Sequence, residues 1–468
     1  MRNSIKTYAL CLKPKQKSLK SRHMTMISLG GVIGAGLFVG SGAVINTTGP
    51  AAVLSYLLAG LLIVLVMRML GEMAVANPRT GSFSDYARIA LGDWAGFAVG
   101  WLYWYFWVIV LAVEAVAGAE ILQVWFPGLP VWVASFGLML LLTLTNLASV
   151  KSYGEFEFWF ASIKVAAIIA FILLAGAFVL GIFGDGGGTT YLSKPDGFAP
   201  DGGIAVLSGV VVVIFAFVGA EIATIAAAES SEPGRSVTQA TNNVITRVLV
   251  FYVLSVFLIV CIVPYDSTVL GESPFVAALD KVGVAGAADV MNAIVLTAVL
   301  SCLNSGLYVA SRMNFTLARN GDAPQWMVQL NSRGVPSRAI FAATSIGFLS
   351  VIANAVSDDV FSFLLNTSGA VALFVYLLIA ISQIVLRRRL ERENPEALEV
   401  RMWAFPWLSY LVVFGITVVI ASMAFVEEVR SQLYLGLLSV AVVLGAYWLR
   451  ARRGSERAPE ARPQPSSG

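Results

Sequence analysis

Twelve apolar stretches, each long enough to cross a lipid bilayer, follow one another along this chain. A helix that crosses ~30 Å of hydrocarbon needs roughly 20 mainly apolar residues. The sequence is 58% hydrophobic and only 13% charged, which excludes an ordinary soluble domain. We therefore expect an all-α polytopic membrane protein with transmembrane helices at roughly 26–45, 51–75, 95–124, 130–150, 156–183, 204–228, 244–264, 285–311, 339–355, 361–386, 404–426 and 431–449.

The basic residues gather on one side of these predicted helices. Of the 31 Lys and Arg, nearly all fall in loops on the side of the N-terminus, whereas Lys194, Lys281 and Arg430 lie opposite and Lys164 lies inside a helix. Because Lys and Arg accumulate in cytoplasmic loops, both termini are expected to be cytoplasmic, in a multi-pass protein of the cytoplasmic (inner) membrane. No cleavable signal peptide is expected, since the first 22 residues are polar and basic.

A glycine-rich run marks the first predicted helix. Residues 30–42 contain six glycines, and Gly34 and Gly36 favour an opening of the helix because glycine is a poor helix former. An opened helix at membrane depth is tolerated only where its backbone is buried or lines a cavity, as in many secondary transporters. The sixth helix carries a weaker counterpart, with Gly219 and Glu221 in mid-span. The alternative interpretation is close packing of helices through small residues.

An opening at this point would present groups suited to a molecule with both signs of charge. The amides of Gly34, Ala35 and Gly36 would form a helix N-terminus, which suits a carboxylate. The carbonyls that precede the break, around Ile33, would suit an ammonium group.

The order of the helices predicts two inverted repeats of five helices, followed by two further helices. The predicted parts are a cytoplasmic leader (1–22), helices 1–5 (23–183), an extracellular connection (184–203), helices 6–10 (204–390), helices 11 and 12 (391–453) and a disordered cytoplasmic tail (454–468).

Several short segments resemble a known transporter family. They are residues 31–38 (GVIGAGLF), 219–222 (GAEI), 227–230 (AAES), 303–305 (LNS), 310–313 (ASRM) and 321–324 (GDAP). They resemble the amino acid transporter family of the amino acid–polyamine–organocation (APC) superfamily, over about residues 20–450. Within that family, residues 100–104 (GWLYW), 149–159 (SVKSYGEFEFW), 225–230 (IAAAES), 401–403 (RMW) and 406–408 (PWL) look most like the bacterial γ-aminobutyrate (GABA) permeases.

The resemblance implies a fold, an activity and a substrate site. The fold would be of the LeuT type, with 5 + 5 inverted repeats plus two helices and with helices 1 and 6 discontinuous. The activity would be proton-coupled uptake of an amino acid by alternating access. The substrate carboxylate would lie on the amides of Ala35 and Gly36, its amine would lie on the carbonyls of Val32, Phe215 and Val218, and Phe106, Trp107 and Leu111 would form a wall.

Three charged residues in the membrane are candidates for coupling and gating. An ammonium at Lys164 costs a few kcal/mol unless it is paired or loses its proton, and the resemblance implies that it carries the coupled proton. The alternative is a lysine that snorkels to the inner interface. Glu221, in the break of helix 6, is expected to be linked to the proton or to a gate, and Glu229 is expected to be a gate residue rather than a ligand. A purely structural role for Glu221 is the alternative.

Helices 3 and 8 supply further candidates for the pocket. Trp107, Leu111 and Glu114 share a helix face, so Glu114 is expected at the edge of the pocket. If it lies away from the amides of helix 1, this carboxylate could bind the far ammonium of GABA; the alternative is a glutamate paired with another helix. Asn304 and Ser305, near Ser301 on helix 8, are candidate pocket walls, and interhelical hydrogen bonds explain them nearly as well. Arg68 and Glu72 are expected to pair.

The remaining expectations concern chemistry and partners. The single histidine, His23, argues against histidine-based metal centres, and we expect no enzyme activity, no metal and no cofactor other than the coupling proton. The expected partners are a small amino acid and the lipid bilayer, with no nucleic acid and no obligate protein partner. The alternatives are a permease for lysine or arginine, proline, or small or aromatic amino acids, and an amino acid exchanger.

Overall fold

A computed structural model describes residues 33–77, 83–148, 150–182, 188–193, 197–222, 224, 233–267, 273–331, 335–356 and 358–456 of the chain. These residues form helices, turns and loops, and none of them lies in a β-strand. The expectation of an all-α protein is therefore confirmed for the part of the chain that is described.

The first half of the chain contains α3 (Ala35–Phe38), α4 (Gly40–Thr48), the 3₁₀ turn η1 (Gly49–Ala51), α5 (Ala52–Ala76), α6 (Phe83–Leu91), α7 (Asp93–Gln123), α8 (Val131–Ala148), α9 (Val150–Val179) and η2 (Thr190–Ser193). The second half contains α10 (Gly202–Phe215), α12 (Pro233–Thr246), the π-helix η3 (Arg247–Leu254), α13 (Ser255–Ile262), α14 (Pro274–Val282), α15 (Ala287–Arg319), η5 (Gln325–Val328), α16 (Ser337–Val356), α17 (Asp358–Glu393), η6 (Pro395–Ala397), α18 (Trp407–Ser422) and α19 (Glu427–Glu456).

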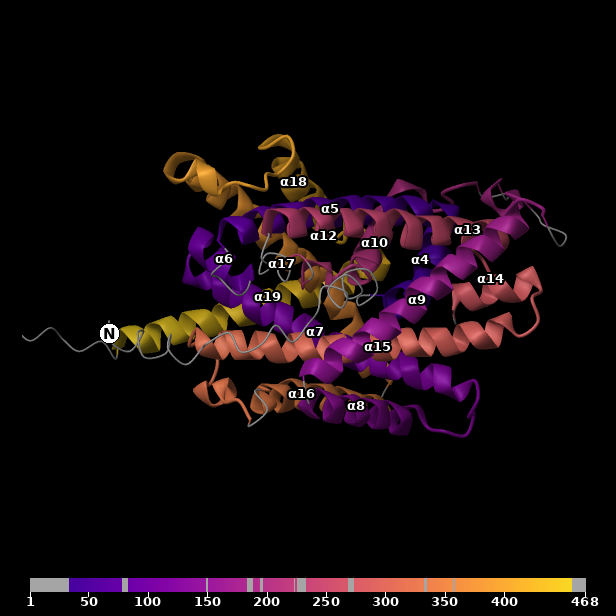
Figure 1. The fold of residues 1–468 in the computed structure, drawn as a ribbon, viewed down its shortest axis with the longest axis horizontal. Helices are drawn as coiled ribbons and strands as arrows, with labels where there is room; N and C mark the ends of the chain where they lie inside the picture. The colour runs from indigo at the N-terminus through magenta and orange to yellow at the C-terminus, as the bar shows by residue number, and fades with distance from the viewer. Residues whose placement is uncertain are drawn as a thin grey trace, which may run out of the picture.

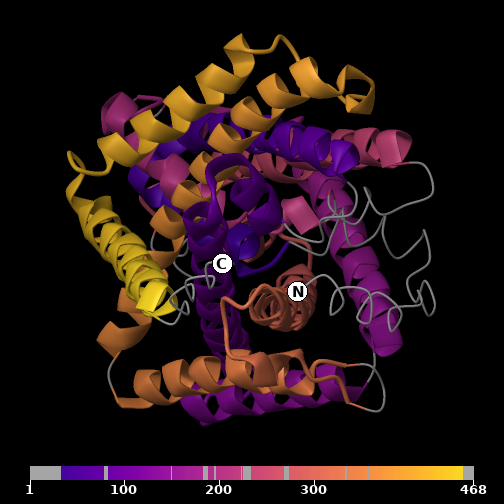
Figure 2. The same cartoon turned by 90° about the vertical axis from the view of Figure 1, so that its left-hand side faces the viewer.

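The long helices run roughly along the long axis of the molecule, around α7 at its centre (Figure 1). Helix α7 packs against α15, α8, α16, α17 and α19, and most of its side chains are buried. Viewed from the end, α8 and α16 lie side by side as an outer layer, while α9 and α19 lie on opposite sides (Figure 2). A central helix with so many neighbours can bring side chains from distant parts of the sequence to one place.

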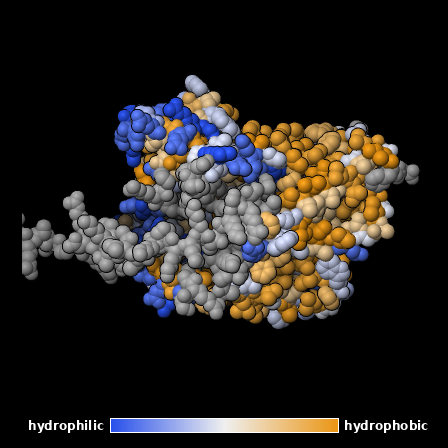
Figure 3. Space-filling model, in the orientation of Figure 1, coloured by the Kyte–Doolittle hydropathy of each residue, from blue (hydrophilic) through white to orange (hydrophobic). Residues whose placement is uncertain are grey.

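The outer surface of the helices is apolar. Figure 3 shows hydrophobic residues over a broad face, with hydrophilic residues gathered toward the end that carries α6. Large apolar side chains such as Leu61, Leu173 and Phe414 are exposed on different helices. Such a surface needs lipid rather than water as its solvent, so the protein inserts into a membrane through several helices.

Seven apolar segments of the described residues are long enough to cross a membrane, and α10, α18 and parts of α8 and α16 are shorter apolar helices. The first of the seven, Ala35–Ala76, is not one straight helix, because Gly49, with a φ of 63°, and η1 separate α4 from α5. The count of twelve transmembrane helices therefore stays a prediction.

Described residues at both positions where the sequence predicts a break have non-helical backbone, while the breaks of helices 1 and 6 themselves stay predictions. Gly34 has an extended backbone just before α3 begins, although residues 1–32 lie outside the described part. Helix α10 ends at Phe215, residues 216–219 form a turn, and Gly219 has a φ of 106°, a conformation that favours glycine. In a continuous helix the Gly219 N–H would donate to the Phe215 carbonyl. Here it donates to the carboxylate of Glu221, at 3.0 Å from each oxygen.

A buried ion pair joins α5 to α17, and it differs from the predicted pairing of Glu72 with Arg68. Glu72 accepts hydrogen bonds from Arg387 Nη1 at 2.5 Å, from Gln383 Nε2 at 2.7 Å and from the Met402 amide at 2.5 Å. Arg68 instead donates to a backbone carbonyl near α18 at 2.9 Å. The spacing of four residues brings Arg68 and Glu72 to one face of α5, but burial favours the partner from another helix.

We expect Arg387→Met to destabilise the protein, because it leaves the buried Glu72 carboxylate without its cation. Breaking a buried pair in this way costs about 3–5 kcal/mol, while replacing both partners is tolerated far better. Thermal unfolding in detergent should show a lower midpoint for Arg387→Met and a partial recovery in Glu72→Gln/Arg387→Met. The exposed Arg392 of the same helix, changed to Met, is the control, and an equal shift in both single variants would contradict the prediction.

Candidate functional site

A small cavity lies where α3, the turn after α10, α7 and α15 meet. It has room for about one water molecule. Its lining residues are Gly36, Phe106, Trp107, Val110, Glu114, Phe215, Ala216, Val218 and Cys302. Six of these were predicted as substrate contacts; Val110, Ala216 and Cys302 were not. The two predicted breaks and the central helix therefore do meet at one point.

Glycine is required at this point because other groups approach it closely. A Cβ on Gly36 would lie 2.8 Å from Ala216 Cα, so the start of α3 touches the backbone of the turn after α10. A Cβ on Gly34 would lie 2.6 Å from Glu114 Oε1 and 2.7 Å from Cys302 Cβ. The glycines thus allow close packing and also bring a carboxylate to the backbone of the break. Close packing through the glycines is therefore observed here, and the opening of helix 1 around a substrate stays a prediction.

Glu114 contacts the amides of the break directly. Its two carboxylate oxygens each lie 3.2 Å from the Ala35 nitrogen and accept its N–H, and the side chain is buried. Glu114 therefore lies on a helix 1 amide, and not away from it, which was the condition under which it could bind a far ammonium. The physical reason is that a buried carboxylate needs donors, and the first N–H groups of a helix have no partner within the helix.

Lys164 contacts the other side of the same break. Its ammonium donates to the Ile33 carbonyl at 2.9 Å and to Ser301 Oγ at 2.8 Å, and the side chain is fully buried. The alternative of a lysine that snorkels to the interface is therefore wrong. Helix α9 begins at Val150, earlier than predicted, so Lys164 lies deeper in the helix than the sequence suggested.

A second carboxylate lies close to Lys164, and the sequence analysis missed it. Glu157, on the same helix as Lys164, is fully buried and accepts the Ser301 hydroxyl at 2.7 Å. Asn304 and Ser305 also face this carboxylate. The sequence did contain a signal for this contact. Glu157 precedes Lys164 by seven residues, and residues seven apart lie on one face of a helix.

Glu221 connects three helices next to the cavity. Its carboxylate accepts the hydroxyl of Tyr103 from α7 at 2.6 Å and that of Tyr376 from α17 at 3.0 Å, in addition to the Gly219 amide. The side chain is fully buried, and Arg247 lies within electrostatic reach. Such a contact can act as a gate, since any separation of α7 and α17 from the turn after α10 must break it.

The remaining predicted residues are less close to the cavity. Leu111 packs with Met139 and Leu303 in a separate apolar cluster, because the cavity-facing stripe of α7 contains Val110 rather than Leu111. Asn304 accepts a hydrogen bond from Asn146 of α8 at 2.8 Å, which fits the interhelical alternative. Neither Asn304 nor Ser305 lines the cavity. Val32 and Glu229 lie outside the described residues.

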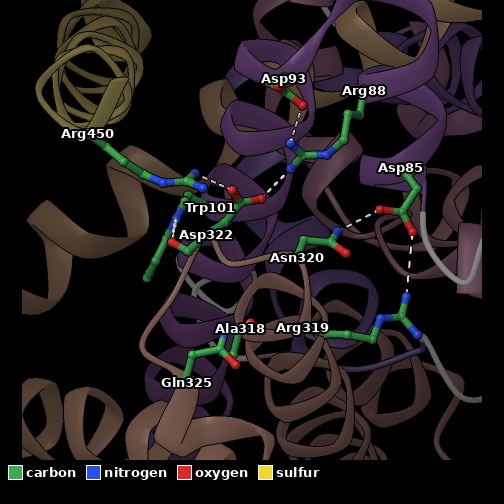
Figure 4. Close-up of polar contacts among 10 residues, drawn as sticks. All are labelled: Asp85, Arg88, Asp93, Trp101, Ala318, Arg319, Asn320, Asp322, Gln325 and Arg450. Atoms are coloured by element: carbon green, nitrogen blue, oxygen red, sulfur yellow. Dashed lines mark hydrogen bonds and ion pairs between the residues drawn. The ribbon is translucent and has the colours of Figure 1, made fainter. Parts of the chain in front are cut away.

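A polar cluster closes one end of the molecule (Figure 4). The buried carboxylate of Asp322, in the loop after α15, accepts hydrogen bonds from Arg88 of α6 and from Arg450 of α19. Beside it, Asp85 of α6 accepts from Asn320 at 2.7 Å. The cluster ties α6 and α19 to the end of α15, and so gives residues 321–324 a structural role.

Comparison of the sequence with known proteins assigns the chain to a family. Residues 23–459 match the model of the family described as amino acid permease. The γ-aminobutyric acid permease of Bacillus subtilis (strain 168) is 54% identical over 448 residues, which cover 95% of this chain and 95% of that protein. The γ-aminobutyric acid permease of Escherichia coli (strain K12) is 47% identical over 430 residues, which cover 91% of this chain and 92% of that protein.

A solved structure shows a similar fold. The crystal structure of a mutant manganese transporter from Eremococcus coleocola matches with a TM-score of 0.56, covering 93% of this chain and 94% of that one. The two sequences share 12% identity, so the likeness concerns the fold alone. It agrees with the all-helical transporter architecture expected from the resemblance.

We expect Gly36→Ala to destabilise the described arrangement, because the new Cβ would overlap the backbone of Ala216. Overpacking of this kind costs typically about 1–3 kcal/mol. The matched control is Gly40→Ala, where the nearest atom to the new Cβ, the Ala35 carbonyl oxygen, lies 3.7 Å away. Thermal unfolding of both purified variants in detergent should show a lower midpoint for Gly36→Ala only, and equal midpoints would contradict the close approach.

Proposed function

Because this chain belongs to the amino acid permease family, we propose that it imports GABA, or a similar small zwitterionic amino acid, together with a proton by alternating access. The family consists of transporters rather than enzymes, and the chain is a multi-pass membrane protein. The proposal extends the family assignment to a substrate, a coupling ion and a mechanism. Its substrate rests on the names of two relatives, at 54% and 47% identity.

One observation about the site supports this proposal above the others. The ammonium of Lys164 contacts the Ile33 carbonyl, and the carboxylate of Glu114 contacts the Ala35 amide. The protein's own opposite charges thus lie on either side of the break, where a zwitterion's charges are expected to bind. A site that binds an ammonium and a carboxylate of the protein has the chemistry to bind those of a substrate.

The carboxylate of a substrate would compete with Glu114 for the Ala35 amide. Two carboxylates that share one set of donors repel each other, so Glu114 must move away or take up a proton. In the cavity, a displaced Glu114 carboxylate is then available to the ammonium of GABA, which is three methylenes away from the GABA carboxylate. An α-amino acid carries its ammonium next to its carboxylate and would gain less from this contact.

The proposed transport cycle uses the two charged residues next to the cavity. Lys164 would carry the coupled proton, because its ammonium joins the break of helix 1 to α15 through Ser301. Glu221, with Tyr103 and Tyr376, would open and close the path beyond the cavity. Alternating access would then consist of breaking these contacts in turn.

The proposed membrane topology follows the sequence. It has twelve transmembrane helices in 5 + 5 inverted repeats plus two, helices 1 and 6 discontinuous, both termini in the cytoplasm and the cytoplasmic membrane as its location. No cofactor other than the proton and no obligate protein partner is part of this proposal.

Proteoliposomes with an imposed pH gradient test the substrate and the coupling together. We expect an inward proton gradient to drive accumulation of radiolabelled GABA, with weaker uptake of lysine, proline and phenylalanine, and a protonophore to abolish it. Empty liposomes are the control. Uptake that needs internal substrate and does not depend on the pH gradient would instead identify an exchanger. Preferred uptake of another amino acid would make that amino acid the substrate in place of GABA.

Replacing Glu114 tests the proposed role of its carboxylate. In the same assay, we expect Glu114→Gln to raise KM for GABA about tenfold or more, since a charge-assisted contact of about 1.5–3 kcal/mol is lost, and to raise KM for an α-amino acid less. Glu120→Gln, at an exposed position of the same helix, is the matched control. Equal changes in KM for both kinds of substrate would refute the contact with the far ammonium.

A further inference from the structure

We propose that Glu157 receives the coupled proton from Lys164 through the hydroxyl of Ser301, and so provides the exit of the proton toward the cytoplasm. This inference rests on the proposed proton symport and extends it by a residue and a direction. Glu157 has no role in the substrate site described above, because it does not line the cavity.

Three side chains form an unbroken chain of hydrogen bonds. Lys164 Nζ donates to Ser301 Oγ at 2.8 Å, and Ser301 Oγ donates to Glu157 Oε1 at 2.7 Å. All three side chains are completely buried. A hydroxyl that accepts from an ammonium and donates to a carboxylate is already oriented for transfer of a proton from one to the other.

The transfer is balanced without any other reactant. An N–H bond of the Lys164 ammonium breaks as an O–H bond forms on Ser301, and the original Ser301 O–H bond breaks as an O–H bond forms on Glu157. The products are a neutral amine and a neutral carboxylic acid, and Ser301 is unchanged. Glu157 then gives its proton to water on the cytoplasmic side, and Lys164 takes the next proton from the opposite side.

The position of Glu157 on the helix sets the direction of this path. Glu157 precedes Lys164 by seven residues on α9, which corresponds to about 10 Å along the helix axis at 1.5 Å per residue. In the proposed topology α9 starts at the cytoplasmic side, so the proton moves away from the Ile33 carbonyl and toward the cytoplasm. Loss of the Lys164 proton also weakens the contact of its nitrogen with the break of helix 1.

The groups around these three hydrogen-bonded side chains are consistent with proton transfer from Lys164 to Glu157. Facing Lys164 are the carboxylates of Glu157 and Glu114, the Cys302 thiol and the more distant cation of Arg247. Facing Glu157 are Lys164 and the polar side chains of Ser301, Asn304 and Ser305. An ion pair and a neutral pair are closer in energy when both partners are buried than they are in water, because burial disfavours the charged forms. Proton transfer between the two residues therefore needs little driving force.

The Glu157→Gln variant distinguishes a role of this residue in proton transfer from a structural role. The glutamine oxygen still accepts the Ser301 hydroxyl but cannot take up a proton. In proteoliposomes we expect net GABA uptake driven by a pH gradient to fall about tenfold or more, while exchange of external for internal GABA, which needs no proton release, continues. Glu155→Gln, at a partly exposed position of the same helix, is the control.

Ser301 provides a second pair of variants, independent of the folding of Glu157→Gln. We expect Ser301→Ala to lose net uptake while it keeps exchange, and Ser301→Thr, which retains a hydroxyl, to restore net uptake. Ser162→Ala removes a hydroxyl from α9 that bonds to its own helix, at the Phe158 carbonyl, and is the control for loss of a hydroxyl.

The outcomes distinguish the two proposals. Net uptake by Glu157→Gln at the rate of the unmodified protein, or Ser301→Thr as slow as Ser301→Ala, would overturn the Glu157 path and leave the symport intact. An unmodified protein that does not respond to the pH gradient would overturn the symport and the path together. Loss of exchange and net uptake to the same extent in all Glu157 and Ser301 variants would assign them a structural role and also overturn the path.

Discussion

Charges buried in a membrane protein need partners, and this requirement explains how the centre of the molecule is arranged. An unpaired ion in hydrocarbon costs at least a few kcal/mol, so each one must bond to a helix end, to another ion or to water. Glu114 contacts a helix amide, Lys164 contacts a backbone carbonyl, and Glu221 contacts two tyrosines and an amide. The N-terminal end of α3 and the turn after α10 supply the backbone groups that these ions use.

The same contacts join helices that separate in the proposed transport cycle. Lys164 lies on α9 and Ser301 on α15, while the Ile33 carbonyl belongs to the break before α3. Glu221 joins the turn after α10 to α7 and α17. A change of charge on one of these side chains therefore changes the attraction between helices. In the proposed cycle, this is how a proton or a charged substrate would change which side of the protein is open.

The sequence predicted those parts of the fold and site that depend on local features. Apolar stretches predicted the helices, and Gly34 and Gly219 lie in non-helical backbone next to α3 and α10. Lys164 stood out because a cation in an apolar helix is costly.

Glu157, Cys302 and the partner of Glu72 were missed, because they depend on which helix faces meet. The resemblance implied Leu111 in the substrate wall, yet the cavity is lined by Val110 and Leu111 packs in a separate apolar cluster.

The close approach of helices at the cavity also limits what can bind there. Phe106, Trp107 and Phe215 line a space for about one water molecule, and Gly36 touches the backbone of Ala216. A zwitterion of GABA's size needs more room, so the proposed binding at this cavity would require the aromatic side chains and the two helix ends to move apart. The free energy needed to move these groups apart would come from interactions that become stronger when the substrate is bound. In the proposed binding mode, the substrate's carboxylate would replace Glu114 on the Ala35 amide and the freed Glu114 would pair with the substrate's ammonium, so no buried charge would lose its partner as the cavity opens.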